Sequence, residues 1–135
     1  MTKLASNHVI VVDDEPMVRD LLKELLKDLG YKVVALASNG QIAFDKVKEH
    51  RPEIVCLDIN MPEVNGLDAL ASIKTVNSEI IVIMVTAVSD SSEVQQAIRT
   101  GADGYILKPF TGLQIDEAMK KARAKREARL SAKRT

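Results

Sequence analysis

Short runs of consecutive apolar residues recur along the chain, and most of their members have branched side chains. Four such runs lie at residues 9–12, 33–36, 54–57 and 80–85, and a weaker fifth lies at 104–107. Continuous apolar runs of this length are typical of strands buried on both faces, as in parallel sheets. The pattern therefore predicts five buried strands.

Between these runs, the apolar residues follow the spacing of helices. The clearest series is Val18, Leu21, Leu22, Leu25, Leu26 and Leu29. Pro16 stands in the first turn of this helix and Gly30 ends it, as is usual for these two residue types. Four further helices are predicted: residues 39–50, residues 67–75, a segment from a cap at Ser91 or Ser92 to Gly101, and a segment capped by Thr111.

The strict alternation of strands and helices predicts the fold class. Five βα units with right-handed connections form an α/β fold, with a parallel sheet covered by helices on both faces. Five units are too few for a closed eight-stranded barrel, so the sheet is open and doubly wound, in three αβα layers. Such a sheet binds its ligands at the carboxyl ends of its strands.

Polar residues stand at four of these strand ends. They are Asp13, Asp14 and Glu15 after the first strand, Asp58 and Asn60 after the third, Thr86 after the fourth and Lys108 after the fifth. Carboxylates that converge in one crevice resist joint ionisation unless a divalent cation lies between them. A few oxygen ligands with room for water suit Mg²⁺ better than zinc or a caged Ca²⁺.

Magnesium held by one or two carboxylates usually serves phosphate chemistry. Lys108 and Thr86 would then direct an ammonium and a hydroxyl at phosphoryl oxygens. Asp58 is the single aspartate directly after the central strand, whereas Asp13 and Asp14 are adjacent and can share a cation. We therefore expect Asp58 to be the nucleophile that carries an aspartyl phosphate. A simpler reading makes Asp13 and Asp14 only the N-terminal cap of the Leu-rich helix.

These motifs together resemble the receiver domain of two-component response regulators, of the chemotaxis (CheY-like) type. The resemblance rests on Asp13-Asp14-Glu15-Pro16, Asp58-Ile59-Asn60-Met61-Pro62 with Gly66, Thr86-Ala87 and Lys108-Pro109-Phe110, and it covers residues 8–122. It implies the flavodoxin-like strand order 2-1-3-4-5. It also implies a division into a lead at 1–7, a receiver domain at 8–122 and a basic helical tail at 123–135.

The resemblance also assigns roles to the site residues. Asp58 is implied to be the phosphoacceptor, with Asp13, Asp14, Asp58 and the backbone carbonyl of Asn60 as ligands of Mg²⁺ or Mn²⁺. Thr86 and Lys108 are implied to contact the phosphoryl group, and the Lys108–Pro109 peptide bond to be cis.

Thr86 and Tyr105 are implied to be switch residues that remodel the face of the fourth helix, fifth strand and fifth helix. In the purely structural alternative, Tyr105 is a packed aromatic residue with no switching role.

The expected function is a phosphorylation-dependent signalling switch that changes its partner binding. The expected partners are a histidine kinase or histidine phosphotransfer protein and a downstream protein target, with the chain a monomer or a phosphorylation-dependent dimer. We expect self-phosphorylation and autodephosphorylation rather than conventional enzymatic turnover. Two alternatives stay open. The chain is a fragment of a larger regulator with a DNA-binding or enzymatic output domain, or it is a phosphorelay intermediate.

Two other classes fit less well. A flavodoxin-like FMN carrier needs a phosphate loop after the first strand, where Asp13, Asp14 and Glu15 would repel the phosphate. An aspartyl-phosphate hydrolase of the haloacid dehalogenase type needs a second aspartate at the position of Asn60.

Length and composition indicate the number of domains and the cellular compartment. The chain has 135 residues, which favours a single domain, and 46% of them are hydrophobic. Its one cysteine, Cys56, cannot form an internal disulfide, and no run is long enough for a signal peptide or a membrane span. We therefore expect a cytoplasmic protein without membrane insertion.

The formal net charge of zero conceals two opposite blocks. Eight basic residues and one acidic residue follow residue 117, so that segment carries +7 and residues 1–117 carry −7. Residues 123–135 are too few for a helix-turn-helix unit, which argues against direct binding of nucleic acid. A solvated helical extension, a contact with a partner or with nucleic acid, and a contact with the acidic body all remain open.

Overall fold

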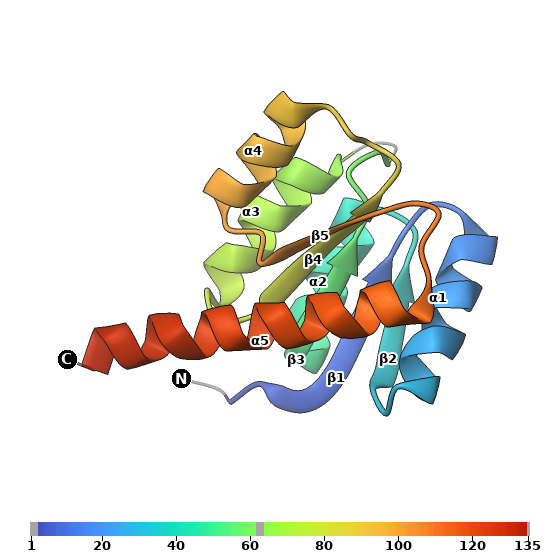
Figure 1. Ribbon diagram of the computed structural model, residues 1–135. Coiled ribbons are helices and arrows are strands. Elements are labelled where there is room, and N and C mark those ends of the chain that lie inside the picture. The colour runs from blue at the N-terminus through green and yellow to red at the C-terminus, as the bar shows by residue number, and fades with distance from the viewer. Residues whose placement is uncertain (1–2, 62–63, 135) are drawn as a thin grey trace.

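The computed structural model, which describes residues 3–61 and 64–134, contains one parallel five-stranded sheet (Figure 1). The strand order is β2-β1-β3-β4-β5, which confirms the predicted doubly wound α/β fold. The strands are β1 (Ala5–Val12), β2 (Lys32–Ala37), β3 (Pro52–Leu57), β4 (Ile81–Thr86) and β5 (Gly104–Leu107).

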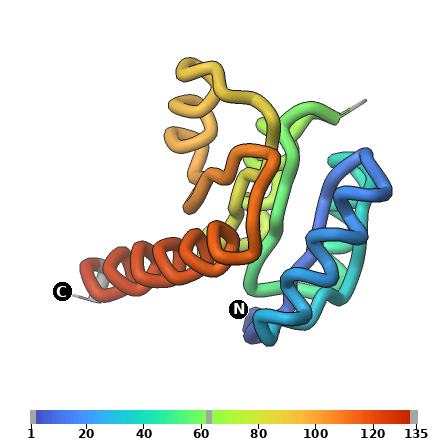
Figure 2. Tube along the Cα trace, turned by 45° about the vertical axis from the view of Figure 1, so that its right-hand side comes forward, coloured from blue at the N-terminus to red at the C-terminus, as the bar shows by residue number. Residues whose placement is uncertain are grey.

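Helices cover both faces of the sheet (Figures 1 and 2). They are α1 (Pro16–Asp28), α2 (Gly40–His50), α3 (Gly66–Val76), α4 (Ser91–Thr100) and α5 (Gly112–Arg134). Helices α1 and α5 pack on one face, and α2, α3 and α4 pack on the other. None of the helices within the described ranges has the length and apolar character needed to cross a bilayer.

The strands divide their side chains between two hydrophobic clusters. In β1, Val9 and Val11 face α1 and α5, while Ile10 and Val12 face the opposite layer. This alternation follows from the pleat of a strand, which points successive side chains to opposite faces. Because both faces are covered, the central parts of the strands are continuously apolar, and this is why they could be located in the sequence.

Most element boundaries differ from the prediction by one or two residues, and two of the differences have a clear physical reason. Strand β1 begins at Ala5, four residues before the apolar run, because Ala5 pairs with Pro52 at the start of β3 although its neighbours are polar. Helix α4 is capped by Asp90, whose carboxylate accepts hydrogen bonds from the backbone N–H groups of Ser92 and Glu93. The predicted caps, Ser91 and Ser92, instead lie in the first turn of α4.

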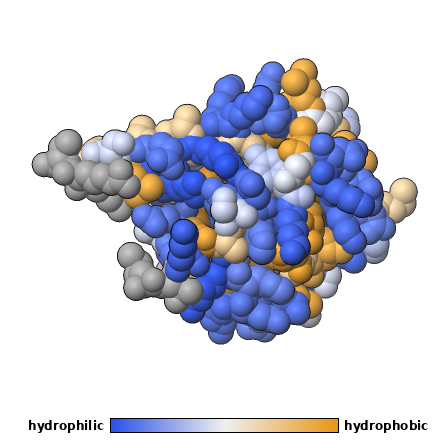
Figure 3. All heavy atoms as spheres, turned by 90° about the horizontal axis from the view of Figure 1, so that it is seen from below, coloured by the Kyte–Doolittle hydropathy of each residue, from blue (hydrophilic) through white to orange (hydrophobic). Residues whose placement is uncertain are grey.

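Helix α5 begins at the predicted place and runs further than the others. The Thr111 hydroxyl accepts a hydrogen bond from the Gln114 backbone N–H, and the Gln114 side chain accepts one from Thr111. This reciprocal pair is a capping box. The helix has no break at residues 122–123, and its last turns extend past the sheet (Figure 1). Seen from below, hydrophilic residues cover most of the surface, with apolar patches between them (Figure 3).

Candidate functional site

The carboxyl ends of the strands bring the predicted polar residues to one edge of the sheet. Asp13 follows β1, Asp58 follows β3, Thr86 ends β4 and Lys108 follows β5. Strands β1 and β3 are neighbours although β2 lies between them in the sequence. The strand order therefore reverses beside Asp13 and Asp58, which is where ligands bind in open sheets of this kind.

Lys108 lies between two buried carboxylates. Its ammonium nitrogen is 2.7 Å from Asp13 Oδ2 and 3.2 Å from Asp58 Oδ2, and it is 3.6 Å from Glu15 Oε1. Asp13 is 1% exposed and Asp58 is 4% exposed, so water screens these pairs little. Burial lowers the pKa of Lys108, but the hydrogen bond to Asp13 and the charge of Asp58 outweigh it and raise that pKa.

The acidic cluster holds more negative charge than one ammonium can neutralise. Carboxylate oxygens of Asp13, Asp14 and Asp58 lie within 4.8 Å of one another. Burial raises the pKa of Asp13, and the hydrogen bonds from Lys108 and from the Glu15 backbone offset this only in part. Oxygen ligands so close together are a fitting set for a small, hard divalent cation.

Hydrogen bonds from nearby backbone N–H groups orient the two buried carboxylates. Asp13 Oδ1 accepts from the N–H of Glu15 at 2.9 Å, and Asp58 Oδ1 accepts from the N–H of Asn60 at 3.3 Å. Each bond joins an aspartate to the residue two places on, as in an Asx turn. In each aspartate the other oxygen, Oδ2, is the one that contacts Lys108.

Gly66 permits the close packing behind Asp58. A side chain at Gly66 would overlap the carbonyl oxygen of Asp58, and its Cβ would lie 2.5 Å from Ile59 Cα. The N–H of Gly66 donates to the Ile59 carbonyl at 2.8 Å. The start of α3 is thereby held directly against the loop that carries Asp58.

Thr86 and Tyr105 meet at the backbone of one residue, Val88. The Thr86 hydroxyl is buried and accepts from the Val88 N–H at 3.3 Å, while the Tyr105 hydroxyl donates to the Val88 carbonyl at 2.7 Å. Tyr105 therefore reaches the β4–α4 loop and does not join the acidic cluster. No sequence pattern indicates this shared partner, because a backbone contact does not depend on the identity of the valine side chain.

The other predicted features of the site are placed as follows. Asn60 is exposed, and its N–H contacts Asp58. The Lys108–Pro109 peptide bond is cis, the isomer that the resemblance implies. Pro62 of the predicted motif lies outside the described residues.

A doubly wound sheet with buried aspartates and a lysine at its carboxyl edge is the arrangement of a signalling receiver. The chain belongs to the response regulator receiver domain family, which it matches over residues 9–120. It is therefore a phosphorylation-dependent switch of two-component signalling. Receiver domains bind Mg²⁺ at an acidic pocket, and Asp13, Asp14 and Asp58 form such a cluster.

Individual relatives agree with this assignment. The chain is 40% identical to the chemotaxis protein CheY of Bacillus subtilis over 116 residues, which are 86% of this chain and 97% of that protein. It is 42% identical to CheY of Listeria monocytogenes over 84% of this chain and 96% of that protein. A similar solved structure is the CheX–CheY–BeF3–Mg²⁺ complex of Borrelia burgdorferi, with a TM-score of 0.80 and 28% identity over 83% of this chain and 85% of that chain.

Proposed function

We propose that Asp58 is the phosphoacceptor of this receiver. The observation that carries the proposal is the buried Asp58 carboxylate, which shares the Lys108 ammonium with Asp13 at the carboxyl edge of the sheet. Of the three clustered aspartates, Asp58 alone follows the central strand β3. Asp13 and Asp14 follow β1 together and are available to hold a cation.

The proposed reaction transfers a phosphoryl group from a phosphohistidine of a kinase or phosphotransfer protein. A carboxylate oxygen of Asp58 attacks phosphorus, an O–P bond forms and the P–N bond breaks. The imidazole nitrogen keeps the electron pair of the broken bond and takes up a proton. Lys108 stays charged because of its acidic neighbours, and its ammonium can follow the negative charge that builds on the phosphoryl oxygens.

We propose Mg²⁺ or Mn²⁺ as the cofactor of this step. Asp13, Asp14 and Asp58 would hold the ion, together with the backbone carbonyl of Asn60. The ion would neutralise carboxylate and phosphoryl charge. The raised pKa of Asp13 supports the proposal, since it reflects a buried carboxylate that its present partners compensate incompletely.

The proposed switch uses Thr86 and Tyr105. Because the Thr86 hydroxyl accepts its bond from Val88, its own proton is free to be donated to a phosphoryl oxygen. Rotation of the Thr86 side chain toward Asp58 would break its hydrogen bond with the Val88 N–H. The carbonyl of the same residue, Val88, accepts the hydrogen bond from Tyr105. The two residues are thus coupled through one peptide segment between β4 and α4.

The proposed output surface is the face formed by α4, β5 and α5. Ile98 on α4 is 53% exposed and Leu107 on β5 is 47% exposed, so apolar side chains are open to a protein partner there. We propose a downstream protein target, a cytoplasmic location and a monomer or a phosphorylation-dependent dimer. The proposed receiver domain spans 8–122, preceded by a lead at 1–7 and followed by the basic tail at 123–135.

The proposal is tested by intact mass after incubation with acetyl phosphate, with and without Mg²⁺. Wild type should gain one phosphoryl group only when Mg²⁺ is present, and D58N should gain none. D45N is the matched control, because Asp45 is an exposed aspartate on α2 that pairs only with surface groups. An adduct of undiminished yield on D58N, or no Mg²⁺-dependent adduct on wild type, would refute the assignment.

A further inference from the structure

The basic C-terminal part of α5 lies against the base of the sheet, which we define as the edge where the strands begin. Arg123, Arg126 and Arg129 recur at intervals of three residues, so they lie on neighbouring positions of one helix side. All three contact carboxylates that are buried at this edge. The arginines are therefore engaged within the chain.

The first anchor is Glu53 at the start of β3. This residue is 5% exposed, and its carboxylate accepts from Arg123 at 3.0 Å, from Arg126 at 2.7 Å and from the Asn7 backbone N–H at 2.8 Å. The Arg123 guanidinium also donates to the Asn7 side chain and lies over the ring of Tyr31. Glu53 would be a buried, uncompensated charge without these two arginines.

The second anchor is Asp103, directly before β5. Its side chain is 1% exposed, and Oδ1 accepts from Arg129 at 3.2 Å. Oδ2 accepts from Lys74 of α3 at 2.8 Å and from the Val82 backbone N–H of β4 at 3.0 Å. One carboxylate thus joins α3, β4 and β5 to the end of α5.

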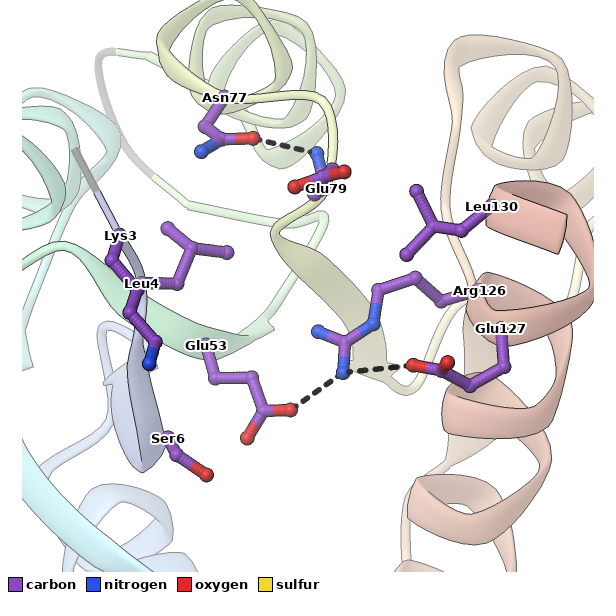
Figure 4. Close-up of a pocket in the computed structure, with 9 residues that line it drawn as sticks. All are labelled: Lys3, Leu4, Ser6, Glu53, Asn77, Glu79, Arg126, Glu127 and Leu130. Atoms are coloured by element: carbon purple, nitrogen blue, oxygen red, sulfur yellow. Dashed lines mark hydrogen bonds and ion pairs between the residues drawn. The ribbon is translucent and has the colours of Figure 1, made fainter. Parts of the chain in front are cut away.

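Figure 4 shows the pocket between α5 and this edge of the sheet. Arg126 reaches from α5 to Glu53 and also lies 3.8 Å from Glu127. Leu130 of α5 and Leu4 near the start of β1 line the same pocket of about 290 Å³. The part of α5 from Arg126 to Leu130 therefore forms one wall of this pocket and is not a free appendage.

Both anchored strands lead to residues of the acidic site at their other ends. Strand β3 runs from Glu53 toward Asp58, and β5 runs from Asp103 toward Lys108. Strand β4 lies between them in the sheet. A helix bound to both anchors bridges β4 and ties β3 to β5 at the edge opposite the acidic cluster.

We propose that residues 123–130 form a strap that is docked by Glu53 and Asp103, and that its arginines neutralise these carboxylates instead of binding an anionic partner such as nucleic acid. The strap makes this part of the basic tail an integral part of the receiver fold. It also accounts for part of the charge opposition between the positive tail and the negative body, since three of the eight basic residues after residue 117 contact two carboxylates of the body.

Hydrogen exchange of the backbone amides at 123–130 tests the docking in the 135-residue chain. We expect these amides to be protected in wild type, and protection to fall about tenfold or more in E53Q and in D103N. The amides of α1 serve as the internal reference. The control is D116N, which removes a half-buried carboxylate of α5 that pairs with Lys120 and contacts neither anchor. Unprotected amides in wild type, or an equal loss in D116N, would overturn the proposal.

Binding of a short double-stranded DNA, as a polyanion probe, tests whether the arginines are occupied. Wild type should bind weakly, and E53Q/D103N should bind about tenfold more tightly, because release frees three arginines. D116N/E117Q changes the net charge equally on the same chain and should show little gain. Wild-type binding as tight as that of E53Q/D103N would overturn the proposal.

A second variant covers the case in which E53Q/D103N does not fold. R126Q/R129Q removes one arginine contact from each anchor and leaves the carboxylates in place. We expect it to lose protection at 123–130 about tenfold, like the acidic variants, without a gain in DNA binding. Unchanged protection in R126Q/R129Q would contradict the docking.

Discussion

Lys108 places its ammonium between two carboxylates that have little access to water. Its distances of 2.7 Å to Asp13 and 3.2 Å to Asp58 allow a charge-assisted hydrogen bond to each. This single cation limits the repulsion in the acidic cluster, and it stands where phosphoryl charge would appear. The two roles can be separated by experiment, since only the second depends on a phosphodonor.

K108Q should slow phosphorylation by acetyl phosphate about 100-fold, because a preorganised charge at the reacting group is lost. Binding of Mg²⁺ should not weaken, since the carboxylates remain and a competing cation is gone. Intact mass against time measures the first effect and titration calorimetry the second. The control is K120Q, which removes an exposed lysine of α5. Wild-type phosphorylation kinetics in K108Q would contradict the role given to this residue.

Y105F should separate the switch from the chemistry. The variant loses the 2.7 Å hydrogen bond to the Val88 carbonyl, and we expect a loss of about 1 kcal/mol in the free energy of unfolding. The phosphorylation rate should stay that of wild type, because Tyr105 does not contact the acidic cluster. Urea unfolding and the mass assay measure the two quantities. A drop in rate as large as that of K108Q would show that Tyr105 acts on the reaction itself.

The acidic residues and Lys108 could be predicted from sequence because each one directly follows an apolar strand. Parallel strands present their carboxyl ends at one edge, so residues far apart in the chain must converge there. The partners of Tyr105 could not be predicted in this way. Its hydroxyl contacts a backbone carbonyl in a loop, and only the path of that loop decides which carbonyl is near.

Strands and helices could be predicted best where burial imposes the pattern. Strand β5 has the predicted bounds, and β3 differs from its prediction only by Pro52 and Glu53 at its start. The polar first half of β1 was missed because its pairing partner lies elsewhere in the chain. The cap of α4 was misplaced by one or two residues, because serine and aspartate are both good caps and stand side by side.

A substitution at Gly66 tests whether the close contact between the start of α3 and the Asp58 loop is needed for stability. G66A would force a methyl group into the Asp58 carbonyl oxygen and the Ile59 backbone. We expect a loss of about 3 kcal/mol in the free energy of unfolding, because backbone atoms cannot yield as a side chain can. Urea unfolding measures the loss.

G112A is the matched control for this substitution. Gly112 begins α5, and the nearest atom to an added Cβ there is Leu25 Cδ2 at 3.5 Å, an ordinary contact. G112A should therefore be nearly neutral. A G66A variant as stable as G112A would show that the loop can move away from α3 at little cost.

The whole chain is neutral because an acidic body and a basic helix end balance each other. The two charge blocks could be predicted from the sequence, but contacts between them could not. Which acid meets which arginine depends on where α5 ends relative to the starts of β3 and β5. The structure pairs Arg126 with Glu53 and Arg129 with Asp103, and both acids are buried.

Glu53 should make stability depend on pH in a defined direction. Burial opposes its ionisation, but the bonds from Asn7, Arg126 and Arg123 outweigh this and hold its pKa below the usual 4.5. The unfolded chain therefore binds a proton at higher pH than the folded chain does. The stability that Glu53 contributes is complete above pH 4.5 and is lost as the pH falls through the lowered pKa.

E53Q should accordingly be less stable than wild type by about 2 kcal/mol at pH 7. The difference between the two proteins should shrink as the pH is lowered below 4.5. Urea unfolding at a series of pH values measures it. A difference that stays constant through the acid range would show that the ionised Glu53 carboxylate does not stabilise the fold.

Phosphorylation at Asp58 is tested most directly by locating the modified residue. Borohydride reduces an aspartyl phosphate to homoserine, which tandem mass spectrometry can place in the sequence after treatment of the chain with acetyl phosphate. We predict homoserine at position 58, only in samples that contained Mg²⁺. Homoserine at position 13 or 14 with none at position 58 would contradict the assignment.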